Sequence, residues 1–250
     1  MPQQFDNNNP RRLILDVQHG GLGDHLAFST LPEIAHAQGY EVWLSNCSEF
    51  RNSEIKEVVW QKNPFFKGFC DQLPNAGHQT ISLLEGSYRY FDREFIERIE
   101  EAHNLRSQNC YPKTYLQHAE VTDFNCRTIV DIGSTTHEFS QSTLADFLHW
   151  SQHHFDINLN EALIPHFKLQ VAKNNPNSNF GIPVLVESLA HYATLLANCH
   201  TLVCVHSGAH ALAASLHHQG RMPRIICLTR AWNYNSRTFV FPNVFYHIAV

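Results

Sequence analysis

The sequence predicts an α/β protein built on parallel sheets. Two stretches carry this prediction, one in each half of the chain, and in both a short apolar run leads through a glycine-containing turn into a segment with helical periodicity and then into another apolar run. A strand, a crossover helix and a second strand in that order favour parallel pairing. The composition, 43% hydrophobic and 16% charged over 250 residues, excludes an intrinsically disordered chain.

The first stretch covers residues 12–45. The run RLILDV (12–17) predicts a buried strand, and the glycine turn HGGLGD (19–24) follows it. Apolar residues then recur at helical spacing from Leu26 to Ala35, which predicts one helix ending before Gly39. The run EVWLS (41–45) supplies the next strand.

The rest of the first half continues the alternation of short elements, at 57–60 and 80–84, with a charged helix at about 91–103. Periodicity then lapses over about 104–125, around Pro112, and this stretch is the predicted linker. We therefore expect an N-terminal domain over residues 1–115 and a C-terminal domain over residues 116–250.

The second half restarts the α/β pattern. The apolar stripe from Leu185 to Leu196 predicts a helix, with Gly181 and Pro183 at its entry. The other expected elements are strands at 128–132, 167–171, 201–205 and 224–228 and helices at 142–154 and 209–217. Two such halves imply a cleft between them, faced by the carboxyl ends of the strands.

Charge and hydropathy exclude several classes of protein. The net charge of −5 provides no field for binding nucleic acid. No apolar stretch is long enough to span a bilayer and the first ten residues are polar, so we expect a cytoplasmic protein without a transmembrane segment, although peripheral membrane contact stays open. The seven cysteines form no CxxC pair, which argues against both disulfides and a cysteine zinc site.

Eighteen histidines raise the question of a metal site. His206 and His210 have the i, i+4 spacing that can chelate a metal on a helix, but no HExxH motif surrounds them. Adjacent histidines, as at 153–154 and 217–218, point about 100° apart on a helix and make poor ligand pairs. We expect no metal and no cofactor.

The first glycine turn is a candidate site. Gly21 and Gly23 permit close approach of a ligand, and the free amides at the start of the following helix favour anions. A dinucleotide fingerprint is disfavoured because Leu26 stands where a small residue is needed. Asp24 and His25 follow in the first turn of the helix, and Asp24 is either a reactive carboxylate or only a favourable charge at the helix dipole.

The second candidate site is the turn VHSGAH (205–210). A strand leads through Ser207 and Gly208 into an alanine-rich helix, so the amides near Ala209 are available for a phosphate, with His206 and His210 beside them. The alternative is a purely structural turn in which Ser207 caps the helix.

At these two turns the sequence resembles glycosyltransferase family 9, the lipopolysaccharide heptosyltransferases. The first turn and the stretch after it match the family's Gly-Asp pair and Thr-Leu-Pro motif, and the second turn matches its donor-side Ser-Gly loop and Leu-Ala-Ala helix. Further short similarities lie at 63–64 and 112–116. The matching residues are Gly23, Asp24, Thr30, Leu31, Pro32, Ser207, Gly208, Leu212, Ala213 and Ala214.

The resemblance implies a GT-B fold, smaller than usual, in which two Rossmann-like domains face a central cleft. It implies transfer of a sugar, heptose or related, from a nucleotide-diphosphate sugar to a hydroxyl acceptor with inversion and without an obligatory metal. Asp24 is then the catalytic base, Gly21, Gly23 and His25 lie on the acceptor side, and residues 206–210 bind the donor.

Two other functions stay open. His206 replaces the family's loop aspartate, which favours a catalytically degenerate protein that binds nucleotide sugars or serves as a scaffold. A nonhydrolysing sugar-nucleotide epimerase has the same architecture but needs further acid and base residues.

Overall fold

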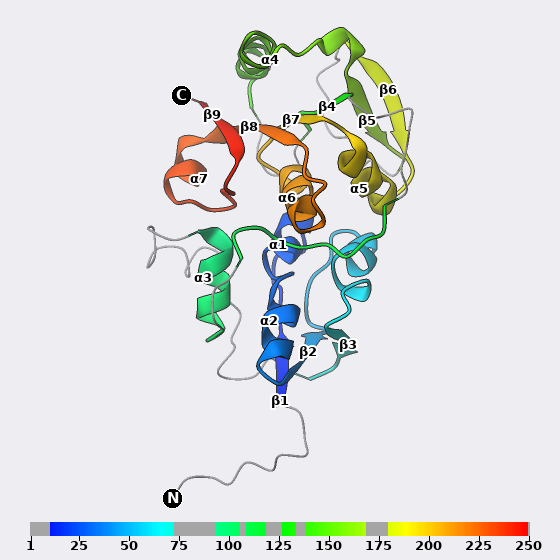
Figure 1. The fold of residues 1–250 in the computed structure, drawn as a ribbon, viewed down its shortest axis with the longest axis vertical. Helices are drawn as coiled ribbons and strands as arrows, with labels where there is room; N and C mark the ends of the chain where they lie inside the picture. Colours follow the sequence, from blue (N-terminus) through cyan, green and yellow to red (C-terminus); the bar gives the residue numbers. More distant parts are fainter. Residues whose placement is uncertain are drawn as a thin grey trace, which may run out of the picture.

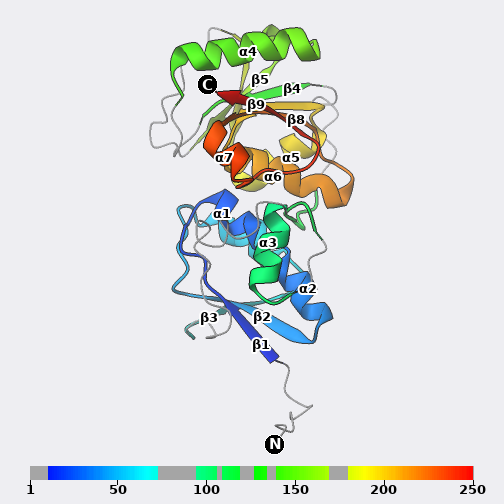
Figure 2. The same ribbon diagram turned by 90° about the vertical axis from the view of Figure 1, so that its left-hand side faces the viewer.

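The computed structural model describes residues 11–72, 94–105, 109–118, 127–133, 139–168 and 180–249. Two parallel sheets lie one above the other along the long axis of the molecule (Figures 1 and 2), which confirms the predicted α/β class. The lower sheet has the order β1-β2-β3 and the upper sheet the order β6-β5-β4-β7-β8-β9, and every pair in both is parallel. The strands are β1 (Arg11–Leu15), β2 (Tyr40–Ser45), β3 (Phe66–Cys70), β4 (Thr128–Asp131), β5 (Leu163–Phe167), β6 (Ile182–Val186), β7 (Thr201–Val205), β8 (Arg224–Arg230) and β9 (Val244–Ala249).

The first predicted unit is present, with one correction. Its helix is divided into α1 (Leu22–Ala27) and α2 (Leu31–Ala37), separated by a turn at 28–30. Pro32 lies in the first turn of α2, and proline is tolerated there because the amides of a first turn have no partner within the helix. The single stripe of apolar residues therefore spans two short helices.

Elsewhere in the lower half, the element expected at 57–60 is a π-helix, η1 (Lys56–Gln61), and the charged helix is α3 (Phe95–Ala102). Strand β3 was not predicted. The element expected at 80–84 lies outside the described residues.

The upper half confirms β4, β7, β8 and the helices α4 (Gln141–Phe155) and α6 (Gly208–Ser215). The sequence interpretation was wrong at Leu185, which lies on β6, since α5 begins only at Leu189 and ends at Asn198. Pro183 fits there because β6 is an edge strand, where a missing amide costs no ladder bond. Strand β5 ends where the expected strand at 167–171 should begin, and β9 and the short helix α7 (Ala231–Asn235) were not predicted.

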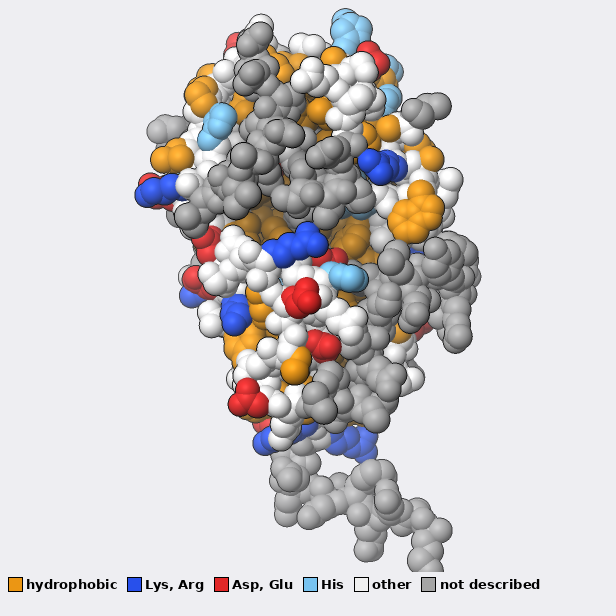
Figure 3. Space-filling model, turned by 180° about the vertical axis from the view of Figure 1, so that it is seen from behind, with side chains coloured by type: hydrophobic (Ala, Val, Ile, Leu, Met, Phe, Trp, Pro, Cys, Tyr) orange, Lys and Arg blue, Asp and Glu red, His pale blue; other side chains and the backbone are white. Residues whose placement is uncertain are grey.

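Buried apolar side chains form two clusters in the described part of the chain. The larger is continuous through both halves, from Leu13 in β1 to Leu212 in α6, and the smaller includes Phe147 of α4. Figure 3 shows hydrophobic side chains in separate patches on the back of the molecule, some of them at mid-height beside a basic side chain. Among the described helices, none is both long and apolar enough to cross a bilayer. The six described cysteines form no disulfide.

Candidate functional site

The two glycine turns meet where the halves of the molecule join. Each follows a strand of a different sheet, β1 or β7, and opens a helix, so that α1 and α6 lie against each other (Figures 1 and 2). A methyl group added at Gly208 would lie 3.0 Å from Leu22 Cβ and 3.4 Å from the amide nitrogen of Gly23. The two turns are therefore in direct contact, and no ligand atom fits between Gly208 and Leu22 in this conformation.

The first turn is held by the segment that follows β2. The amide of Arg51 donates to the carbonyl of Gly20 at 2.8 Å. A Cβ at Gly20 would lie 2.8 Å from that same amide nitrogen, so the close approach of the two backbones requires glycine here. Because β1 and β2 are adjacent parallel strands, this contact places Arg51 beside the turn.

Asp24 is the third residue of α1 and is half-buried. Its Oδ2 accepts the amide hydrogen of Gly21 at 3.1 Å, which closes the first turn of the helix. Burial raises the pKa of Asp24 above its ordinary value, against the opposing effect of the positive groups of His19 and Arg51. A carboxyl group with a raised pKa and two exposed basic neighbours is suited to accept a proton.

His25 is fully buried and points away from solvent. Trp60 Nε1 donates to His25 Nδ1 at 3.0 Å, so Nε2 carries the ring proton and donates to the carbonyl of Glu49 at 2.7 Å. The ring stacks on Phe50 with centroids 4.2 Å apart, and burial lowers the pKa of His25 to about 4. This neutral histidine supports the turn from behind, and its predicted place on the acceptor side stays a prediction.

The second turn uses its own polar groups. Ser207 Oγ accepts from the amide of Ala209 at 3.3 Å, and the amide of Ser207 donates to His210 Nδ1 at 3.3 Å. Two of the amides expected to bind a phosphate therefore have side-chain partners already, as a helix cap requires.

His206 and His210 are both buried, with ring centroids 4.7 Å apart. His206 Nδ1 lies 2.8 Å from Thr229 Oγ1. His210 Nε2 lies 2.8 Å from the carbonyl oxygen of Phe239, and His210 Nδ1 lies 2.7 Å from the carbonyl oxygen of Ser207. Within the described ranges no group of three or more histidine, cysteine, aspartate or glutamate residues is placed to hold a metal ion.

Sequence reasoning missed three residues of this site. His19 and Arg51 flank Asp24, and the ring of Phe239 lies 3.5 Å from where a methyl group on Gly23 would be. Arg51 could have been found, since it closely follows the strand adjacent to β1. No pattern pointed to Phe239, which arrives from a loop distant in the sequence.

The fold and the paired turns define an α/β protein with two parallel sheets. No family model matches the sequence, and no curated protein matches it. Among solved structures, the chain is similar over nearly its whole length to heptosyltransferases of glycosyltransferase family 9, and this likeness confirms the predicted resemblance at the level of the fold.

One of these structures is TibC, an iron-containing dodecameric glycosyltransferase from enterotoxigenic E. coli H10407, with a TM-score of 0.63 and 13% identity over 97% of this chain. The others include a family 9 glycosyltransferase from Veillonella parvula DSM 2008 (TM-score 0.56, 11% identity, 96% of this chain and 85% of that one) and the E. coli heptosyltransferase WaaC with ADP (0.54, 11%, 96% and 94%). The chain spans 63% of the length of TibC.

TibC contains iron and has also been solved with ADP-D-beta-D-heptose. The described residues of this chain offer no cluster of three or more metal ligands, so they do not fit an iron site.

Proposed function

We propose that this protein transfers a sugar from a nucleotide-diphosphate sugar to a hydroxyl acceptor, with Asp24 as the catalytic base. The observation that carries the proposal is the half-buried carboxyl of Asp24, whose pKa is raised by burial, at a junction where the carboxyl ends of both sheets meet. The similarity of the fold to heptosyltransferases supports it.

In the proposed sugar transfer, the side chains at this junction have different roles. Displacement at the anomeric carbon requires removal of the proton of the acceptor hydroxyl, which a carboxylate at Asp24 can take. The exposed His19 and Arg51 lie near Asp24, and their positive groups favour its carboxylate form. The acceptor then binds beside Asp24, and the leaving diphosphate, which departs from the opposite face of the sugar, lies on the side of Ser207, Gly208 and Ala209.

A second function is favoured by the packing of the turns. Gly208 is pressed against α1, and the amides of Ser207 and Ala209 are satisfied within the chain. A protein that has kept the fold but lost transfer, and that binds a nucleotide sugar or acts as a scaffold, accounts for this closed arrangement.

The test is sugar transfer with and without the carboxylate. Purified protein is incubated with ADP-, GDP- and UDP-sugars, binding is measured by thermal shift, and release of the nucleoside diphosphate is followed. Asp24→Asn should reduce release by about 10²- to 10⁴-fold, the usual contribution of a general base. Asp146→Asn, which changes an exposed aspartate on α4, serves as the matched control and should release at the wild-type rate.

The outcomes separate the two functions. If the wild-type protein binds a nucleotide sugar without releasing the nucleoside diphosphate, the result favours a degenerate binding protein. If it binds none of the three donors, both proposed functions are wrong. Release by Asp24→Asn at the wild-type rate refutes the assignment of the base.

A further inference from the structure

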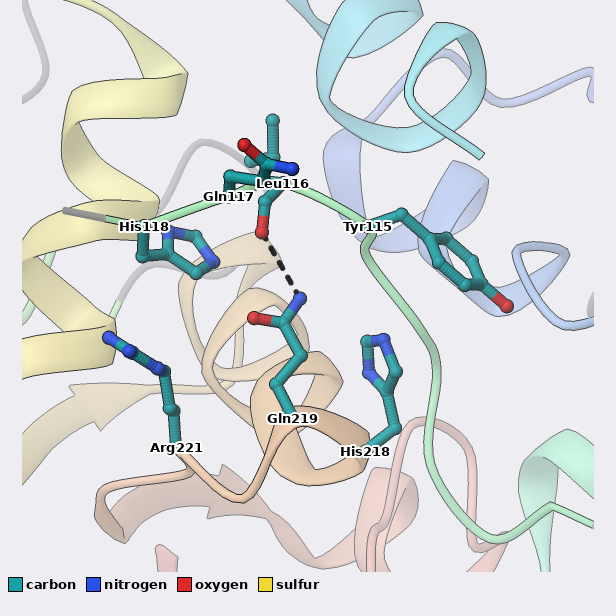
Figure 4. A pocket seen from close by; sticks show the side chains of 7 residues that line it. All are labelled: Tyr115, Leu116, Gln117, His118, His218, Gln219 and Arg221. Carbon is teal, nitrogen blue, oxygen red and sulfur yellow. Dashed lines mark hydrogen bonds between the residues drawn. The ribbon is translucent and has the colours of Figure 1, made fainter. Parts of the chain in front are cut away.

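A pocket of about 390 Å³ lies outside the two glycine turns and shares no residue with them. It forms where the extended segment 115–118, which connects the halves, passes the short helix η5 (Leu216–Gln219) and the residues after it (Figure 4). Its volume is in the range of small-molecule sites. The lining residues are Tyr115, Leu116, Gln117, His118, His218, Gln219 and Arg221.

The walls of this pocket are fixed by hydrogen bonds across the junction. Gln219 Nε2 donates to the carbonyl of Thr114 at 2.6 Å and to that of Leu116 at 3.3 Å, the latter drawn in Figure 4. Tyr115 donates its hydroxyl to Glu33, which also pairs with Lys113. The connecting segment is therefore tied to both halves, and the pocket is preformed.

Three of the residues that line the pocket have basic side chains. His118, His218 and Arg221 line it and no aspartate or glutamate does, and within the described ranges no carboxylate pairs with Arg221. Burial, together with the nearby charges of Arg221 and His218, lowers the pKa of His118 to about 4. Arg221 therefore carries the lasting positive charge of the pocket, and an anion beside it would offset that charge.

The hydrogen bonds of His118 define what that anion must offer. Thr194 gives its hydroxyl hydrogen to the carbonyl of Ala190, so Thr194 Oγ1 accepts from His118 Nδ1 at 3.4 Å. The neutral ring then presents Nε2 as an acceptor, and this atom is buried without a hydrogen-bond partner among the described residues. A ligand in this pocket must therefore donate a hydrogen bond to His118 Nε2 while it lies beside Arg221.

We propose that the pocket binds the phosphate group of a small phosphorylated metabolite, with Arg221 contacting two phosphate oxygens and His118 Nε2 accepting the remaining phosphate hydrogen. A phosphate monoester has its second pKa near 6, so it still carries a hydrogen in part of its population at neutral pH. Arginine suits two adjacent phosphate oxygens because its donors are arranged as a planar fork. Sulfate has the same shape but no hydrogen to give, which provides a sharp control.

The experiment is calorimetric titration of the full chain with glycerol 3-phosphate, and with sulfate or glycerol at matched ionic strength. Glycerol 3-phosphate should bind at least about tenfold more tightly than sulfate, and glycerol should not bind. Arg221→Ala should weaken the binding of glycerol 3-phosphate by about tenfold or more, the usual effect of losing a charge-assisted pair. Arg12→Ala, which removes an exposed arginine on β1, is the matched control and should bind like the wild type.

His118→Gln provides a second variant, tested by the same titration after its circular dichroism has been compared with that of the wild type. It should reduce the preference for phosphate over sulfate, because a glutamine side chain can turn its NH2 group to donate to sulfate as well as its oxygen to accept the phosphate hydrogen. Wild-type affinity in Arg221→Ala, equal affinity for sulfate and glycerol 3-phosphate, or no heat with either anion would overturn the proposal. None of these results depends on whether the protein transfers a sugar.

Discussion

Asp24 and His210 occupy the same position in two helices, and the surroundings give them opposite properties. Each is the third residue of its helix and has a side-chain atom close to the amide nitrogen of the capping residue, Asp24 Oδ2 at 3.1 Å from Gly21 and His210 Nδ1 at 3.3 Å from Ser207. Asp24 is half-buried with exposed basic neighbours, whereas His210 is fully buried between the carbonyls of Ser207 and Phe239. The same position in the first turn of a helix thus holds a carboxyl group near solvent in the lower half and an enclosed imidazole in the upper half.

The largest expected effect on stability is that of replacing His210 in the second turn by aspartate, the residue at the same helix position in the first turn. His210→Asp should destabilise the fold by several kcal/mol, about 3 to 5, because it buries a charge against two carbonyl oxygens. Asp24→Asn should change the free energy of unfolding by about 1 kcal/mol or less, since it affects a partly solvated charge at a helix start. Urea unfolding of both variants measures the difference, and equal effects would contradict the comparison.

An effect on the order of 2 kcal/mol is expected from pH at the first turn. The pKa of His25 is about 4 in the folded protein against an ordinary 6.5, so its contribution is complete above pH 6.5 and decreases as the pH falls toward 4. Between pH 7 and pH 5 the wild type should therefore lose about 2 kcal/mol of unfolding free energy through His25 alone.

This loss is measured by urea unfolding at the two pH values. In His25→Gln it should be smaller by about that amount. In His36→Gln, which changes an exposed histidine of α2, it should match the wild type. If His25→Gln and the wild type lose the same stability, His25 is not held neutral.

Alanine substitutions at two glycines where the turns touch should differ in their effect on the free energy of unfolding. Gly208→Ala places a methyl group 3.0 Å from Leu22 Cβ and should destabilise the fold by about 1 to 3 kcal/mol. Gly23→Ala meets Phe239 only at 3.5 Å, so it should be neutral or stabilise the fold by up to about 1 kcal/mol through helix propensity. Thermal unfolding of the two variants checks this, and a neutral Gly208→Ala would mean that the turns are not in contact.

Much of the fold could be predicted from local pattern. Strands β1, β2, β4, β7 and β8 are short apolar runs bounded by turn residues, and such runs specify buried parallel strands wherever they pack. The prediction failed where two periodicities overlapped, as at Leu185, which fits both a helix stripe and the edge strand it occupies. The spacing of apolar residues could not distinguish a helix from a strand at Leu185, because the strand forms only by pairing with β5.

The candidate site could be predicted in part for the same reason. Glycine turns after apolar runs indicated Asp24 and Ser207, and the position of Arg51 after the strand adjacent to β1 could have indicated that residue as well. The sequence could not show that the carbonyl of Phe239 contacts His210, because Phe239 lies in a loop 29 residues further along the chain and no local pattern encodes such a contact.

The sequence by itself determined the class of fold, the two strand–turn–helix junctions and the chemical types of the residues at them, because periodicity and turn chemistry act over a few neighbouring residues. Tertiary structure decided which of these residues face solvent and which backbone amides have a hydrogen-bond partner within the chain. It also brought the two junctions into contact. These outcomes depend on burial and on contacts between distant segments, which set pKa values and hydrogen bonds only after the halves have packed together.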